Sequence, residues 1–148
     1  MHKIKDDYIV LKRGFDHLDE VQKLNRLVFR EKRLINRLDH HPMIFLTAHF
    51  QGQIAGFKIG YPISERVFYS AKGATAPLFR RMGIAKSLLF AMMADARKLG
   101  YQKLHYDTFP NCYPGMTVLG LKNGFHIKHL QWNKEHEDFQ VRMECKLI

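Results

Sequence analysis

The segment from Thr75 to Ala85, with the sequence TAPLFRRMGIA, joins a predicted strand to a predicted helix and carries residues suited to binding an anion. The first amides of a helix have no partner inside the helix, and they lie at the positive end of its dipole. A phosphate group satisfies both features at once. Gly83 has no Cβ to hold an anion away from the backbone, and Arg80 and Arg81 supply charged donors. A turn glycine beside two solvated arginines is an equally good interpretation, and neither one identifies the anion.

The spacing of apolar residues predicts the elements that would position this segment. Strands are expected at 8–12, 43–50, 53–61, 66–75, 102–108, 126–133 and 139–147. Helices are expected at 17–31, 32–38, 83–99 and 115–123, the first with Asp16 as its N-cap. The stretch from 66 to 108 reads as a βαβ unit, which favours a parallel strand pair with a right-handed crossover. The sequence therefore predicts an α/β fold, a mixed sheet covered by helices, in one domain spanning residues 1–148.

Composition narrows the class of protein. Hydrophobic residues make up 46% of the chain, which argues against intrinsic disorder. No apolar run approaches the roughly 20 residues of a membrane span, so no membrane association is expected. Cys112 and Cys145 are too few for a disulfide framework, which favours the cytoplasm.

The formal net charge of +10 attracts polyanions, but the absence of a dense basic tail disfavours nucleic acid as the partner. The adjacent His40 and His41 do not suggest a metal site without further ligands.

Two motifs resemble those of a known family. The run Arg80-x-x-Gly83-x-Ala85, preceded by Pro77, resembles the acetyl-CoA signature of the GNAT superfamily of N-acetyltransferases, R/Q-x-x-G-x-G/A. The pair Gly124-Phe125 is similar to the one that follows the helix after the family's fifth strand. With the element order, the resemblance covers nearly the whole chain. It implies a central mixed β-sheet of about seven strands flanked by helices. It also implies transfer of an acetyl group from acetyl-CoA to a primary amine of a small molecule or a protein.

The resemblance also implies where the cofactor binds. In that family the amides at the start of the helix hold the CoA pyrophosphate, and the preceding strand bonds the pantetheine arm. The residues at the matching positions are Ala74, Thr75, Arg80, Arg81, Met82, Gly83, Ile84 and Ala85. The strands at 66–75 and 102–108 are expected to splay apart around the thioester, with the amine arriving from the opposite side.

Acyl transfer to an amine requires a neutral amine, a stabilised oxyanion and a proton for the departing thiolate. Many family members carry a tyrosine as proton donor in the helix before the Gly-Phe pair, but the matching residue here is Gly120. We predict that Tyr113, in the preceding loop, takes this role. The competing interpretation is an ordinary loop tyrosine.

For the base, the strand at 102–108 offers His105 and Asp107, which alternation places on one face. Glu65 and Tyr69 are further candidates for the base. Each of these residues could instead support the sheet or remain solvated.

Two other functions stay open. The glycine at position 120 suggests a CoA-binding sensor or interaction module with weak or absent catalysis, and the net charge suggests, less strongly, a nucleic-acid-binding domain. A homodimer is a further expectation, through pairing of the strand at 139–147, which is expected to be exposed.

Overall fold

The computed structural model describes residues 8–148. Its strands are β1 (Val10–Arg13), β2 (Ile44–Phe50), β3 (Gln53–Pro62), β4 (Val67–Thr75), β5 (Lys103–Thr108), β6 (His126–Asn133) and β7 (Asp138–Lys146). Its helices are α1 (Leu18–Phe29), α2 (Ile84–Lys98) and α3 (Pro114–Lys122), with a short 3-10 helix η1 (Pro77–Phe79) before α2. Every predicted strand is confirmed to within a few residues.

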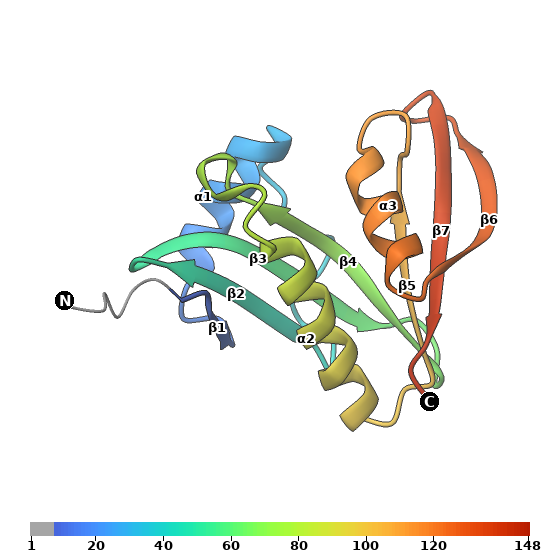
Figure 1. Ribbon diagram of the computed structural model, residues 1–148, viewed down its shortest axis with the longest axis horizontal. Helices are drawn as coiled ribbons and strands as arrows, with labels where there is room; N and C mark the ends of the chain where they lie inside the picture. The colour runs from blue at the N-terminus through green and yellow to red at the C-terminus, as the bar shows by residue number, and fades with distance from the viewer. Residues whose placement is uncertain (1–7) are drawn as a thin grey trace.

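The strands form one mixed sheet in the order β1-β2-β3-β4-β5-β7-β6 (Figure 1). Strands β4 and β5 are parallel, and all other neighbours are antiparallel. The predicted βαβ unit with its parallel strand pair is therefore confirmed. Strand β7 lies between β5 and β6, so both of its hydrogen-bonding edges are used within the chain. The expectation that this strand could pair across a homodimer is wrong for that reason.

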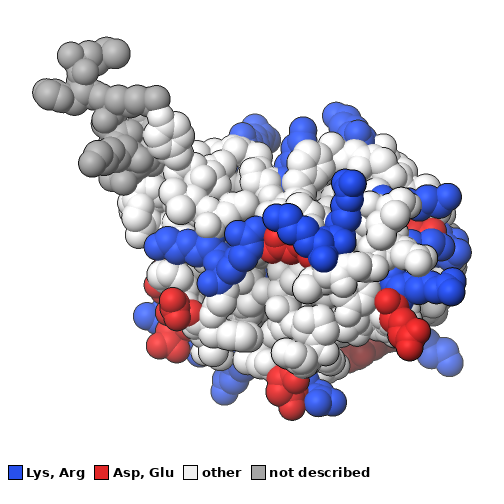
Figure 2. Space-filling model, turned by 90° about the horizontal axis from the view of Figure 1, so that it is seen from below, with Lys and Arg blue, Asp and Glu red and all other residues white. Residues whose placement is uncertain are grey.

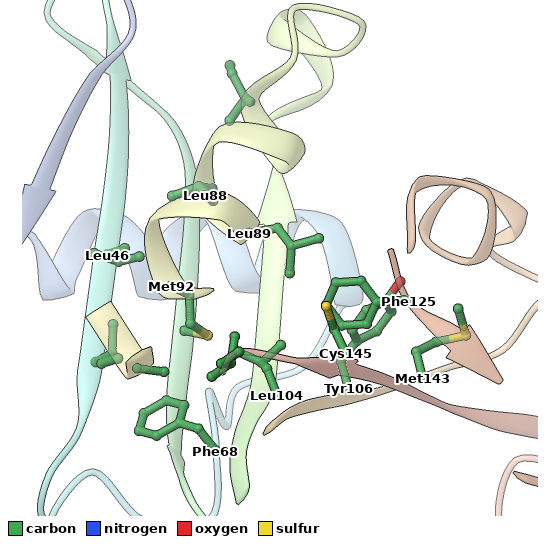
Figure 3. Close-up of a cluster of buried hydrophobic side chains, with 14 of the residues drawn as sticks. Leu46, Phe68, Leu88, Leu89, Met92, Leu104, Tyr106, Phe125, Met143 and Cys145 are labelled. Atoms are coloured by element: carbon green, nitrogen blue, oxygen red, sulfur yellow. The ribbon is translucent and has the colours of Figure 1, made fainter. Parts of the chain in front are cut away.

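Helices α2 and α1 cover opposite faces of the sheet (Figure 1). The α2 residues Leu88, Leu89 and Met92 are almost fully buried against strand residues such as Leu46 and Phe68, as Figure 3 shows. Their helical spacing explains why this face is buried, because residues three and four apart lie on one side of a helix. On the other face, α1 buries Val21 and Leu24 against Phe45, Phe57 and Ile59.

Two local predictions are wrong. Residues 32–38 form no helix, because the buried Asn25 of α1 donates its side-chain amide to the carbonyls of Glu31 and Arg33 and so ties the backbone into a loop. The N-cap of α1 is His17 rather than Asp16, and His17 bonds the Glu20 side chain instead of a helix amide.

The net charge of +10 is visible at the surface. On the face shown in Figure 2, Lys and Arg side chains form a band across the middle of the view, interrupted by few acidic groups. Within residues 8–148, no helix is long and apolar enough to cross a membrane.

Candidate active site

Strands β4 and β5 are paired over only the first part of their length and then separate. Their parallel ladder runs from Val67 opposite Lys103 to Ser70 opposite Tyr106, and it ends there. Strand β4 nevertheless continues to Thr75 and stays paired with β3 on its other side. The two strands start side by side and then diverge (Figure 1). This splay leaves the edge of β4 beyond Ser70 open towards β5, and the pair Ser70–Tyr106 marks its apex.

A cleft of about 680 Å³ occupies the splay. Its volume lies in the range typical of small-molecule sites. On the α2 side it is lined by residues including Lys58, Arg80 and Leu88, and on the α1 side by residues including Phe29 and Leu34. The cleft therefore connects the two faces of the sheet, so that two molecules can approach its centre from opposite sides.

The start of α2 lies at this cleft and has an open backbone. Gly83 is the N-cap residue, with φ of 78°, and no side chain caps the helix. Among the described residues, the first bond of α2 joins the Ser87 amide to the Gly83 carbonyl, so the amides of Ile84, Ala85 and Lys86 find no partner within the helix. Arg81 also has a left-handed backbone, with φ of 67°, which is uncommon for a residue with a Cβ. These uncapped amides are open to a ligand, and their use as an anion site stays a prediction.

The predicted cofactor residues fall into two groups. Those that line the cleft are Ala74, Thr75, Arg80 and Ala85. Arg81, Met82, Gly83 and Ile84 belong to the turn and the first residue of the helix, outside this lining. The Ile84 side chain is buried in the core, so only its backbone amide is available to a ligand.

Two of the three predicted catalytic residues line the cleft. Tyr113 is the N-cap residue of α3 and is half exposed. Asp107 also lines the cleft, but its oxygens accept bonds from Arg142 at 2.9 and 2.8 Å and from the Tyr69 hydroxyl at 2.8 Å. Burial, together with the Asp107 carboxylate, raises the pKa of Tyr69, and the hydrogen bond to Asp107 raises the pKa of Arg142. A carboxylate held in this way is suited to positioning Tyr69 more than to accepting a proton.

His105 is placed differently from the expectation. It shares a face of β5 with Asp107, but its Nε2 lies 2.6 Å from the Glu144 carboxylate of β7 and its side chain does not line the cleft. Because the ring is buried against β7, we correct its assignment as a candidate base to a residue that supports the sheet.

Sequence reasoning missed Lys58, the one lysine within the apolar strand β3. Its side chain is only 5% exposed, and its Nζ donates to the Ser70 Oγ at 2.9 Å. Burial lowers the pKa of Lys58 to about 8. A charged residue between Phe57 and Ile59, in a run with no acidic neighbour, is the signal that could have identified it.

Replacing Lys58 by Met is expected to stabilise the protein at neutral pH. Lys58 has a pKa near 10.5 in the unfolded state and about 8 in the folded state, so the folded state binds its proton less tightly. Below pH 8 the side chain is charged in both states, and its burial then destabilises the fold. The gain at pH 7 should be about 1–3 kcal/mol, given roughly 1.4 kcal/mol per pKa unit and the loss of the bond to Ser70. It should shrink as the pH rises from 8 towards 10.5. Urea denaturation at pH 7 and pH 10 checks both statements, and a Lys58→Met protein that is less stable at pH 7 would contradict them.

The structure explains why residue 120 is a glycine. The Tyr106 hydroxyl donates to the Met116 carbonyl at 2.6 Å and lies where a Cβ on residue 120 would stand. The Tyr106 ring also contacts Phe125 edge-on (Figure 3). Burial raises the pKa of Tyr106 to about 12. Tyr106 of β5 therefore fills the space beside Gly120, and no larger residue fits there.

Gly120→Ala is accordingly expected to destabilise the protein by about 1–3 kcal/mol, the usual cost of overpacking a core. The added methyl group would displace the Tyr106 hydroxyl and break its bond to Met116. Gly115→Ala in the same helix is the matched control, because a Cβ there meets nothing within 4 Å. Thermal and urea denaturation of both variants measure the difference, and equal stability of the two would refute the explanation for Gly120.

Known proteins resemble this chain in sequence profile and in fold. The sequence profile of the acetyltransferase (GNAT) family matches residues 8–115. A comparison with curated protein sequences finds no significant match. Among experimental structures, Ard1 from Thermoplasma volcanium is 16% identical, with a TM-score of 0.83 over 95% of this chain and 98% of that chain.

Two further structures contain the cofactor. A GNAT family acetyltransferase from Elizabethkingia anophelis with acetyl-CoA bound is 21% identical, with a TM-score of 0.80 over 96% of this chain and 99% of that chain. An acetyltransferase from Bacillus subtilis in complex with CoA is 19% identical, with a TM-score of 0.82 over 95% and 100%. At these identities the likeness establishes the fold. The family profile, in turn, spans most of the chain, from β1 to the start of α3. The chain therefore belongs to the GNAT family of acetyltransferases.

Proposed function

We propose that this protein is an acetyl-CoA-dependent N-acetyltransferase that moves an acetyl group to a primary amine of a small molecule or a protein. The observation that carries the proposal is the uncapped start of α2 at a cleft that opens where β4 and β5 diverge. Structural relatives with acetyl-CoA or CoA bound share this fold.

The cofactor would be held by backbone groups and one arginine. The amides from Arg81 to Ala85 would bind the pyrophosphate, with the Arg80 side chain adding charge. The open edge of β4 at Ala74 and Thr75 would bond the amides of the pantetheine arm, as an added strand would. The thioester would then reach the centre of the cleft. All these residues belong to what we propose is one domain, residues 1–148.

The acceptor amine would enter from the α1 side. There the cleft is lined by apolar residues of α1 and of the following loop, including Val28, Phe29, Leu34 and Ile35. Asp107 and Tyr113 are the polar groups predicted from the sequence that face the same cleft, Asp107 acting through its bond to Tyr69. Cys112 and Cys145 are free thiols, which fits a reducing compartment such as the cytoplasm.

The experiment that tests the proposal combines binding with turnover. Acetyl-CoA should raise the melting temperature of the protein, and a panel of primary amines should include acceptors that release free CoA thiol. No stabilisation by millimolar acetyl-CoA would refute the proposal. Binding without thiol release for any amine would favour a CoA-binding module that lacks catalysis. That function stays open because position 120 is a glycine and not a tyrosine.

A further inference from the structure

The ammonium group of Lys58 lies at the apex of the splay between β4 and β5. Its Nζ bonds the Oγ of Ser70, which is the last β4 residue that pairs with β5. Lys58 itself lies opposite Gly73 of β4, and its Nζ is 3.3 Å from the position that a Cβ on Gly73 would take. The glycine therefore leaves the side chain free to cross β4 and reach the cleft, which Lys58 lines.

Lys58 approaches the cleft from the α2 side. Lys58 is two residues from Gly56 and from Gly60 along β3, so all three lie on the same face of the strand. A Cβ on either glycine would contact side chains of α2. The pair Tyr69 and Asp107 lies on the opposite face, where neighbouring residues such as Lys72 contact the loop after α1. The lysine thus shares a face with the open amides at the start of α2, whereas the Asp107 network lies on the face of the acceptor.

The Lys58 ammonium has donors to spare. A lysine carries three donors, and the described residues engage one of them, through Ser70. The carboxylates that line the cleft are Glu31, which is bonded to Lys72, and Asp107, which is bonded to Arg142. No acidic side chain within residues 8–148 is paired with Lys58. The remaining donors of the Lys58 ammonium are therefore available to a group in the cleft that becomes negatively charged.

We propose that Lys58 donates the proton that the CoA sulfur takes as the thioester bond breaks. This inference rests on the function proposed above, and it assigns the proton donor that Gly120 does not supply.

The neutral amine nitrogen attacks the thioester carbonyl carbon, a C–N bond forms, and the carbonyl π electrons move to oxygen. When the C=O bond re-forms, the C–S bond breaks and its electron pair goes to sulfur. An Nζ–H proton of Lys58 passes to sulfur and gives CoA thiol. The new amide nitrogen loses its extra proton to water, and Lys58 regains one from solvent.

The acidity of Lys58 suits this role. Burial brings its pKa to about 8, so at pH 7 the group is mostly protonated and yet gives up its proton readily. An ordinary thiol has a pKa near 8.5, so donor and acceptor are closely matched. Tyr106 at the same apex is a much weaker acid, and its hydroxyl proton is already donated to the Met116 carbonyl.

A titration of bound CoA tests the contact directly. The thiolate of enzyme-bound CoA is followed by its ultraviolet absorbance between pH 5 and pH 9.5, with a desulfo-CoA complex as the blank. In the wild type, the Lys58 ammonium should lower the thiol pKa of bound CoA by about one unit or more relative to the Lys58→Met complex, as a nearby cation does. The exposed Lys23 of α1 provides the matched control, and Lys23→Met should behave as the wild type.

Kinetics provide the second measurement. Lys58→Met should bind acetyl-CoA within about threefold of the wild type but turn over about 100-fold or more slowly, the usual contribution of a general acid. Equal thiol pKa values in the wild-type and Lys58→Met complexes, or a wild-type kcat in the variant, would overturn the inference. These failures differ from failure of the proposed function, in which CoA would not bind the wild type or no amine would release CoA thiol from it.

Discussion

Gly83→Glu is expected to weaken acetyl-CoA binding by about 100-fold or more, which corresponds to roughly 3 kcal/mol. A Glu side chain at the N-cap would place its carboxylate over the open amides of α2, where it competes with the pyrophosphate and repels it. A Cβ on this residue meets nothing within 4 Å, so the effect would not arise from a clash with the protein. Calorimetric titration of acetyl-CoA into the wild type and the variant measures the loss.

The matched control is Gly100→Glu at the other end of α2. Gly100 also has a positive φ, 96°, and open space around its Cβ position, so the substitution introduces comparable backbone strain. It lies beyond the C-terminus of the helix, about 25 Å from Gly83 at 1.5 Å per residue. Gly100→Glu should therefore bind acetyl-CoA as the wild type does. Equal affinities of the two variants would exclude the α2 amides as the pyrophosphate site.

Asp107→Ala is expected to lower the free energy of unfolding by about 2–4 kcal/mol, near the range for breaking a buried ion pair. The change leaves the guanidinium of Arg142 without its carboxylate and removes the acceptor of the Tyr69 hydroxyl. Both partners are largely shielded, with side-chain exposures of 14% for Asp107 and 29% for Arg142. Urea denaturation at pH 7 measures the loss.

Two variants help to interpret that loss. Asp39→Ala breaks a pair with Arg37 in which both side chains are mostly exposed, and it should leave stability unchanged. The double variant Asp107→Leu with Arg142→Leu removes both charges and should recover much of the stability. If it also recovers turnover, Asp107 acts by holding the strands together through Arg142 and not through its bond to Tyr69, which the double variant lacks. Loss of turnover without loss of stability in Asp107→Ala would instead support Asp107 as the base.

The elements could be predicted from the sequence because their signals are local. The helical spacing of Leu88, Leu89 and Met92 and the glycine at position 83 lie within one short segment, and this segment also carries the candidate anion site. The segment at 32–38 was predicted wrongly because its conformation depends on Asn25, a residue of the preceding helix. Helix propensity cannot register such a side-chain bond.

The catalytic part of the site was less predictable because it depends on contacts between distant residues. Alternation correctly placed His105 and Asp107 on one face, but it could not show that Glu144 of β7 engages His105. The reason for Gly120 is the hydroxyl of Tyr106, a residue on another element. Lys58 acquires its properties from burial and from Ser70, and neither is encoded in the strand that contains it.

The cleft that crosses the sheet connects these observations. The start of α2 and Lys58 face it from one side, and the loop after α1 faces it from the other. This arrangement allows a phosphate-bearing cofactor and an amine to meet at the apex near Ser70 without sharing an entrance.

A crystal structure of the protein with acetyl-CoA tests the central claim most directly. We expect the pyrophosphate on the amides between Arg81 and Ala85, the pantetheine arm along the open edge of β4, and the thioester at the apex beside Ser70. A structure in which the pyrophosphate binds elsewhere, with those amides bonded to protein groups, would contradict the account.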